Sequence, residues 1–351
     1  MTRHRDAQRA KRLSTSILAP VTMFAPLVSV AQTASVPRHI NIFAPSSTPA
    51  IQINHLSMLV FAITGAIFLF VAALLLFVIF RYRARGDESV EPPQVYGSNR
   101  IELAWTVIPV LIVIVLFLAT ARIIFAVQDP EEPRSALDVT VIGHQFWWEF
   151  RYPNLGIVTA NELHVPVSSA NDPSPTYLKL MSADVVHSFW VPQLAGKTDL
   201  IPNRVNQMWL DPLQTGVYLG QCAQFCGMQH ANMLIRVYVD TPKQFEAWVR
   251  NQQSPARTEP QVALGRHIFE TQSCMNCHTI RGTAATGRFG PDLTHLMSRS
   301  TIASGIAPNN RATLVDWIKS PDHLKKGALM PAMQLSDDQV EALVDYLSTL
   351  Q

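Results

Sequence analysis

Two long stretches without a charged side chain constrain this chain more than any other feature. Residues 56–80 and 103–121 contain no Asp, Glu, Lys or Arg, and about 20 consecutive apolar residues are enough to cross a bilayer as a helix. Arg81, Arg83 and Arg85 follow the first stretch directly, and such basic clusters face the cytoplasm. We therefore expect a hairpin of two transmembrane helices, assigned to residues 32–125, with both outer ends on the opposite side.

The first 31 residues have the pattern of a secretory signal peptide. Basic residues crowd positions 1–12, an uncharged stretch covers 13–31, and Ser29-Val30-Ala31 offers a small-x-small cleavage site. An uncleaved membrane anchor is the alternative, and it leads to the same topology downstream. The formal net charge of the whole chain is only +2, which gives no indication of nucleic-acid binding.

From residue 137 onward the apolar pattern changes to that of short strands. Residues 137–142 and 234–239 are rich in β-branched side chains, and Pro, Gly, Asn and Asp separate such segments. Many short strands with this punctuation predict a β-sandwich or barrel, here assigned to residues 126–249. Residues 250–260 are polar, contain proline and lack periodicity, so we expect an interdomain linker there.

One loop, residues 220–233, gathers potential metal ligands, and a further histidine lies upstream. These candidates are His187, Cys222, Cys226, His230 and Met233. Thiolate, imidazole and thioether groups are soft ligands, which select copper, zinc or iron–sulfur over hard cations. The two cysteines alone leave a disulfide or a structural zinc site open. Neither alternative requires the methionine, so the joint pattern favours copper.

Residues 274–278, Cys-Met-Asn-Cys-His, form the attachment signature of c-type haem. A redox pair of cysteines would not require His278, and a zinc site would need two more ligands nearby. Met330 and Met333 follow downstream as candidate axial ligands of the haem iron. Residues 337–347 have helical spacing after a possible N-cap, Ser336. Because all four cysteines fall into these two motifs, none remains for a structural disulfide.

Taken together, these motifs resemble subunit II of cytochrome c oxidase, in the caa-type form with a fused C-terminal class I cytochrome c domain. The resemblance implies a multi-domain chain: a two-helix transmembrane hairpin, an all-β cupredoxin-like Greek-key barrel and an all-α cytochrome c domain over residues 261–351. It also implies a dinuclear copper centre, Cu-A. Its ligands would be His187, Cys222, Cys226, His230, Met233 and the backbone carbonyl of Gln224.

The same resemblance implies haem c, bound covalently through Cys274 and Cys277, with His278 as one axial ligand of the iron. Residues 290–293, Gly-Pro-Asp-Leu, match the turn of cytochromes c whose proline carbonyl accepts a hydrogen bond from the iron-bound histidine. A methionine followed by proline is the habit of that family, which favours Met330 over Met333 as the second axial ligand.

Three further assignments rest on the resemblance. The family usually has tryptophan, the point where electrons arrive from cytochrome c, at the position of Phe146, so Phe146, Trp147 and Trp148 form a candidate electron path. Many relatives have a glutamate that reaches magnesium where this chain has Gln224, and a neutral amide is a weaker ligand for a hard cation. Glu102 matches a glutamate near the start of a proton pathway into subunit I.

The function implied is electron transfer within a proton-pumping haem-copper oxidase. Electrons would pass from cytochrome c or another donor through haem c and Cu-A to the haem of subunit I, where oxygen is reduced to water. The implied partners are subunit I, further oxidase subunits and the membrane, with both soluble domains outside the bacterial inner membrane. The alternative is the electron-input subunit of a Cu-A-containing nitric oxide reductase. Because a short linker gives effective concentrations of about millimolar, we expect transient docking between the two soluble domains.

Overall fold

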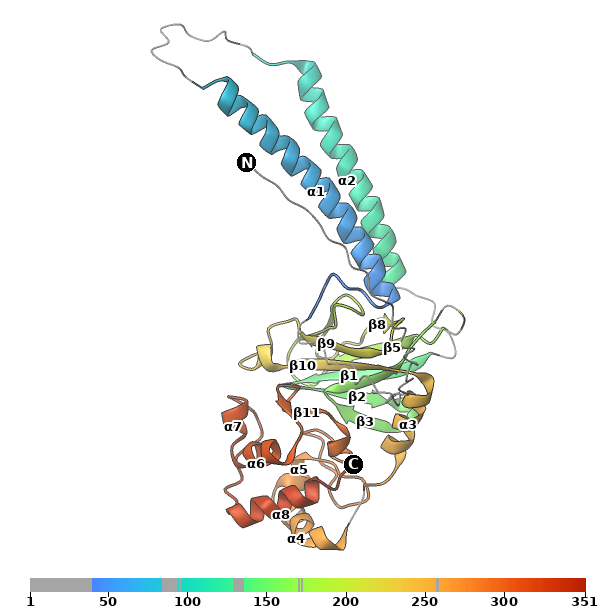
Figure 1. Ribbon diagram of the computed structural model, residues 1–351, viewed down its shortest axis with the longest axis vertical. Coiled ribbons are helices and arrows are strands. Elements are labelled where there is room, and N and C mark those ends of the chain that lie inside the picture. The colour runs from blue at the N-terminus through green and yellow to red at the C-terminus, as the bar shows by residue number, and fades with distance from the viewer. Residues whose placement is uncertain are drawn as a thin grey trace, which may run out of the picture. The chain divides into compact units, whose positions relative to one another are not determined.

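A computed structural model describes residues 40–83, 94, 96–128, 136–169, 171, 173–256 and 259–351 of the chain. The predicted signal peptide, residues 1–31, and Arg85 lie outside these described residues. The described part contains two long N-terminal helices, then a β domain, then a helical domain (Figure 1).

The two N-terminal helices are α1 (Thr48–Arg81) and α2 (Asn99–Gln128). Both are long and apolar enough to cross a membrane, and their large hydrophobic side chains, such as Phe70 and Phe117, are exposed. Pro109 lies inside α2, which membrane helices tolerate. The predicted transmembrane hairpin is confirmed, and both helices extend beyond the uncharged stretches that predicted them.

The β domain consists of two five-stranded sheets, in the orders β3-β2-β1-β5-β8 and β4-β10-β9-β6-β7. Its strands are β1 (Leu137–His144), β2 (Trp147–Tyr152), β3 (Ile157–Ala160), β4 (Glu162–Pro166), β5 (Thr176–Ser182), β6 (His187–Trp190), β7 (Thr198–Leu200), β8 (Asn206–Leu210), β9 (Gly216–Cys222) and β10 (Leu234–Asp240). The pairs β1–β5 and β4–β10 are parallel. This sandwich confirms the predicted cupredoxin-like β domain.

Alternating apolar side chains explain why these segments form strands. Along β10, the buried residues Ile235, Val237 and Val239 alternate with more exposed ones, as expected when one face of a strand packs on a core. Trp148 on β2 and Phe189 on β6 are fully buried, and their rings meet edge to face at 5.8 Å. The core between the sheets therefore holds β6, β9 and β10 rigidly, and these strands flank the ligand loop.

Helix α3 (Pro242–Gln253) follows the β domain and begins with a capping box of Thr241 and Gln244. It extends into the range assigned to the linker, whose bounds of 250–260 stay a prediction. The C-terminal domain is helical apart from a short hairpin of β11 and β12. Its elements are α4 (Ala263–Thr271), α5 (Cys274–Cys277), β11 (Thr301–Ile302), β12 (Ala307–Pro308), α6 (Arg311–Lys319), α7 (Pro321–Leu324) and α8 (Asp337–Leu347).

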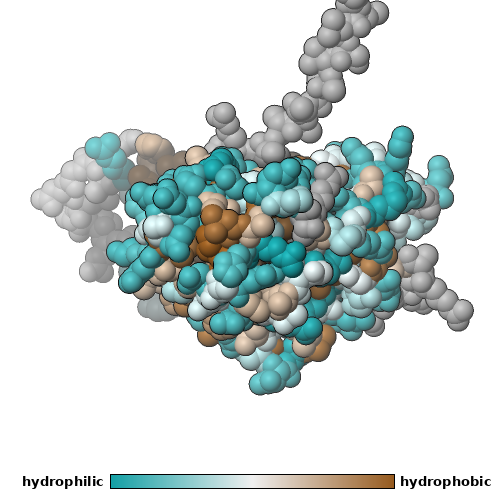
Figure 2. All heavy atoms as spheres, turned by 90° about the horizontal axis from the view of Figure 1, so that it is seen from below, coloured by the Kyte–Doolittle hydropathy of each residue, from teal (hydrophilic) through white to brown (hydrophobic). Residues whose placement is uncertain are grey.

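Helix α8 closes the C-terminal domain against α4. Ser336 caps α8 as predicted, because its side chain accepts a hydrogen bond from the backbone of Gln339. The two helices cross so closely that a Cβ atom at Gly265 would lie 2.0 Å from the carbonyl oxygen of Ala342. The surface view shows a face on which hydrophilic side chains predominate and hydrophobic ones form small separate patches (Figure 2), unlike the apolar surfaces of α1 and α2.

Candidate metal and cofactor sites

Three elements bring the candidate copper ligands together. Strand β9 ends at Cys222, the loop contains the 3-10 helix η2 (His230–Asn232), and β10 begins at Leu234. The backbone N–H of Cys222 donates to the carbonyl of Met233 at 3.0 Å, which joins the two ends of the loop. Strand β6 pairs with β9 and places Phe189 opposite Cys222. This pairing brings His187, the first residue of β6, to the loop.

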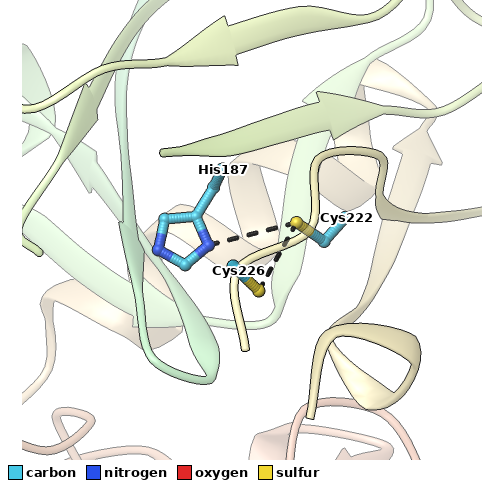
Figure 3. Close-up of side chains that lie close together, drawn as sticks. All are labelled: His187, Cys222 and Cys226. Atoms are coloured by element: carbon cyan, nitrogen blue, oxygen red, sulfur yellow. Dashed lines mark hydrogen bonds between the residues drawn. The ribbon is translucent and has the colours of Figure 1, made fainter. Parts of the chain in front are cut away.

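The two cysteine sulfurs lie side by side between two imidazoles. Cys222 Sγ is 3.9 Å from Cys226 Sγ and 4.0 Å from His187 Nδ1 (Figure 3). Cys226 Sγ is 3.8 Å from His230 Nδ1. Because a disulfide has an S–S length of about 2.05 Å, these cysteines are not bonded to each other, and both remain available as ligands.

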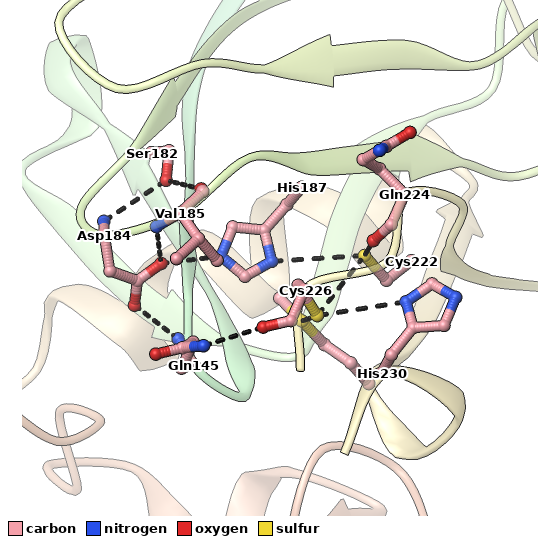
Figure 4. A network of polar contacts seen from close by, with 10 residues as sticks. Gln145, Ser182, Asp184, Val185, His187, Cys222, Gln224, Cys226 and His230 are labelled. Carbon is pink, nitrogen blue, oxygen red and sulfur yellow. Dashed lines mark hydrogen bonds and ion pairs between the residues drawn. The ribbon is translucent and has the colours of Figure 1, made fainter. Parts of the chain in front are cut away.

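A weaker donor lies beside each sulfur. The backbone oxygen of Gln224 is 3.2 Å from Cys222 Sγ, and Met233 Sδ is 3.9 Å from Cys226 Sγ (Figure 4 shows the carbonyl). Cys222, Cys226, His187 and Met233 are buried, whereas the side chain of Gln224 is exposed. All six ligands named from the sequence therefore surround one small volume.

The spacing of the ligands separates a one-metal site from a two-metal site. The donor atoms of His187, Cys222 and Cys226 lie within 4.8 Å of one another, and His230 does not belong to this group. A single tetrahedral zinc ion, with bonds of about 2.0–2.3 Å, would hold all its donors within about 4 Å of one another. With His230 beside Cys226, the candidate donors therefore extend over a larger volume than one such ion would occupy.

Asp184 and Gln145 form a network behind the ligands that the sequence analysis did not identify (Figure 4). One carboxylate oxygen of Asp184 lies 2.7 Å from His187 Nε2, and the other accepts from the backbone N–H of Gln145 at 2.6 Å. The side chain of Gln145 donates to the carbonyl of Cys226 at 2.7 Å. This network links a ligand on β6 to the ligand loop. An aspartate three residues before a histidine was its only sequence signal.

The two thiols shift each other's pKa in opposite directions. The hydrogen bond with Cys226 holds the pKa of Cys222 below its usual range, and the same contact raises the pKa of Cys226, so Cys222 is the thiol that is more readily present as the metal-binding thiolate. Burial alone would raise the pKa of Asp184, but its hydrogen bond with His187 lowers it. A carboxylate paired with one ring nitrogen leaves the other nitrogen, Nδ1, free to face the sulfur.

A glycine makes room for the ligand ring of His187. A Cβ atom at Gly143, on β1, would lie 2.7 Å from His187 Cδ2. On another side, the rings of Trp148 and His187 meet edge to face with centroids 6.0 Å apart. The orientation of this histidine is therefore set by packing as well as by Asp184.

The second site is a cavity of about 440 Å³, lined mainly by the C-terminal domain and on one side by residues of the β domain. Cys274, Cys277 and His278 lie on its wall, together with apolar residues such as Phe269, Leu293 and Leu347. Both candidate methionines, Met330 and Met333, also line it. The volume and the apolar lining suit a cofactor of the size of haem, and the two cysteines are placed to bind it covalently.

His278 is oriented by the turn that the sequence analysis singled out. Its Nδ1 lies 2.8 Å from the carbonyl oxygen of Pro291, which makes Nδ1 the donor and leaves Nε2 as the free ligand atom. A Cβ atom at Gly290 would lie 2.5 Å from His278 Cε1, so the glycine lets the turn approach the ring. Burial lowers the pKa of His278, which favours the neutral imidazole that binds iron.

The remaining predicted residues separate into two groups. Phe146, between β1 and β2, and Trp147, the first residue of β2, line the 440 Å³ cavity from the β domain. Trp148 is fully buried in the core beside His187. The aromatic stretch therefore contacts both sites. Glu102 lies in the first turn of α2 and is not part of either site.

Three protein families match consecutive parts of the chain. "Cytochrome C oxidase subunit II, transmembrane domain" matches residues 35–123, "Cytochrome C oxidase subunit II, periplasmic domain" matches residues 137–239, and "Cytochrome c" matches residues 262–351. These matches have the order of parts that the sequence predicted.

Curated relatives cover most of the chain. Cytochrome c oxidase subunit 2 of Alkalihalophilus pseudofirmus is 35% identical over 303 residues, covering 84% of this chain and 85% of the relative. Cytochrome c oxidase subunit 2 of Bacillus sp. (strain PS3) is 35% identical over 289 residues, covering 77% and 79%. The solved periplasmic domain of subunit II of cytochrome oxidase of Bradyrhizobium japonicum is 30% identical with a TM-score of 0.32, and the match covers 34% of this chain and 96% of that domain.

Proposed function

The chain belongs to the cytochrome c oxidase subunit II family, and on this premise we propose which of its residues hold the redox centres and contact the partners. As subunit II of a haem-copper oxidase with a fused cytochrome c domain, it relays electrons toward the reduction of oxygen. Its two apolar helices anchor it in the bacterial inner membrane, with the copper domain on the periplasmic side. The nitric oxide reductase alternative is not favoured, because the relatives above are oxidase subunits.

The copper centre is assigned to six ligands. We propose that Cys222 and Cys226 would hold two copper ions together with His187, His230, Met233 and the carbonyl of Gln224. The observation that carries this assignment is the pair of sulfurs 3.9 Å apart with a different imidazole beside each. When bound, the copper pair supplies one-electron chemistry, and this chain's residues set its geometry and exclude water.

The haem is assigned to the 440 Å³ cavity. Cys274 and Cys277 would bind it covalently and His278 would be one axial ligand, held by the hydrogen bond to Pro291. We assign the second axial position to Met330 rather than Met333, on the methionine–proline pattern alone, because both side chains line the cavity. Phe146, Trp147 and Trp148 are proposed as the electron path, since Phe146 and Trp147 line the haem cavity and the ring of Trp148 meets that of His187.

Two further assignments concern partners. Subunit I receives the electrons, and cytochrome c or another carrier delivers them to the haem domain; further oxidase subunits are expected as well. Glu102 is proposed as a carboxylate near the start of a proton pathway, because it lies at the start of α2, which the topology places on the cytoplasmic side. In this proposal Glu102→Ala slows turnover while the spectra of both redox centres stay intact, and unchanged turnover would remove it.

The decisive test is a metal and spectral analysis of the purified full chain. We expect two copper ions and one covalent haem per polypeptide, with a mixed-valence copper EPR signal that Cys222→Ser abolishes. Zinc, or a single copper per chain, would contradict the copper assignment. Met330→Ala should lower the haem potential, because Met/His ligation raises it, whereas Met333→Ala is the matched control and should leave it unchanged.

A further inference from the structure

A lysine of the haem domain reaches into the copper domain. Lys325, directly after α7, is only 4% exposed. Its Nζ donates to the carbonyls of Phe146 at 2.7 Å and Asn232 at 2.9 Å, both in the copper domain, and to Ala303 of its own domain at 3.2 Å. An ammonium group has three donors, so this one is fully hydrogen-bonded. Asn232 directly precedes the proposed copper ligand Met233.

A glutamate of the copper domain reaches the opposite way. Glu162, the first residue of β4, is 2% exposed. Its carboxylate accepts from the backbone N–H groups of Ser300 at 3.0 Å and Thr301 at 2.9 Å, and from the hydroxyl of Thr301 at 2.8 Å. All of these donors belong to the haem domain, at the start of β11.

Further hydrogen bonds from β10, the neighbour of β4 in the sheet, reach the same segment. Arg236 Nη1 donates to the hydroxyl of Thr301 at 2.9 Å and to the carbonyl of Gly305 at 3.0 Å. The hydroxyl of Tyr238 donates to Ser300 Oγ at 2.8 Å. The β11–β12 segment is thus bound along two strands of the copper domain.

Burial decides what kind of interface this is. Removing a charge from water is costly unless hydrogen bonds replace its hydration. A transient encounter surface keeps its charges at a solvated rim, whereas Lys325 and Glu162 have exchanged water for partners on the opposite domain. Removing either side chain would leave buried carbonyl or N–H groups without a partner, which is unfavourable.

We propose that Lys325 and Glu162 lock the haem domain onto the copper domain in one fixed position, with Phe146 against the haem cavity. This inference rests on the proposed function, because it concerns the path between the two redox centres. It replaces the transient docking that the linker composition led us to expect. Glu162 acts here as a positioning residue, and Lys325 joins the two domains from the wall of the haem cavity, which it lines.

The first test uses the assembled oxidase with the linker lengthened by Gly/Ser residues inserted within residues 255–260. For a fixed interface, the rate of haem-to-copper electron transfer stays the same after the insertion and on adding glycerol. In Lys325→Met and Glu162→Gln, we expect the rate to fall roughly tenfold or more, because each change disrupts buried hydrogen bonds across the interface, and to depend on linker length. Lys326→Met, at the exposed residue after Lys325, and Glu246→Gln, at an exposed carboxylate on α3, are the matched controls.

The second test does not depend on electron transfer. The amides of Ser300 and Thr301 should exchange hydrogen slowly in the unmodified full chain and faster in both variants, while amides of α8 keep their protection. Fast exchange at Ser300 and Thr301 in the unmodified protein, or a transfer rate that falls with linker length there, would overturn the lock. If the lock is wrong but the proposed function is right, the haem and copper spectra stay normal in every variant. Abnormal spectra in the unmodified protein would instead contradict the proposed function.

Discussion

The copper site and the haem site differ in how far the polypeptide alone shapes them. At the copper site, neighbouring ligand atoms already lie 3.2–4.0 Å apart, and strands on both sides hold them. At the haem site the chain encloses a cavity of about 440 Å³, and two methionines line it. Both domains have a hydrophobic core, but in the haem domain part of the apolar surface lines a cavity that the cofactor would fill.

The strongest test of this difference removes the covalent attachment of the haem. Without the cofactor, the apolar wall of this cavity of about 440 Å³ would lose its packing partner, which is destabilising. We expect Cys274→Ser with Cys277→Ser to unfold the haem domain, measured as lost amide protection in α8. The copper EPR signal should persist. Its loss would show that the copper domain also depends on the bound haem for its structure.

The second test introduces a methyl group where the copper domain has no room. In Gly143→Ala the new Cβ would meet the ring of His187 at 2.7 Å. Overpacking of this kind costs about 1–3 kcal/mol, so the melting temperature should fall and the copper EPR pattern should change. Gly156→Ala is the control, because a Cβ atom there meets nothing within 4 Å. Its positive φ makes alanine unfavourable for the backbone, but the new methyl group contacts no ligand. An unchanged EPR pattern in Gly143→Ala would show that the ring is not held by this contact.

The third test concerns the carboxylate behind His187. Asp184→Asn should weaken copper binding about 10–100-fold, the range typical of partners that orient a ligand, as measured by competition with a chelator. Asp240→Asn is the matched control, because Asp240 pairs with His164 at the same distance of 2.7 Å away from the copper loop. Equal copper affinities in the two variants would show that Asp184 does not orient the ligand.

The smallest effect is expected at Gln145. Gln145→Ala removes one hydrogen bond, to the carbonyl of Cys226, worth about 1 kcal/mol. Copper should still bind, with a small loss of thermal stability and a slight change in the EPR pattern. If Gln145→Ala lost copper as completely as Cys222→Ser, copper binding would depend on this hydrogen bond as strongly as on a ligand. The copper site would then not be held mainly by its strands and ligands.

Much of both sites was predictable because their residues are close together in the chain. Cys222, Cys226, His230 and Met233 belong to one loop, and Cys274, Cys277 and His278 to one motif. The capping box at Ser336 and the two apolar helices are also local features. In contrast, Asp184, Gln145 and the lock of Lys325 and Glu162 were missed, because each acts through contacts with segments distant in the chain.

The sequence by itself determined the order of the domains, the presence of two membrane helices and the chemical types of the candidate ligands. These depend on local spacing, hydrophobic period and ligand softness, all of which can be read along the chain. Only the tertiary structure decided that β6 brings His187 beside Cys222, and that Lys325 and Glu162 are buried across the domain interface. Strand pairing and burial join residues far apart in sequence, and no local pattern specifies which of them will meet.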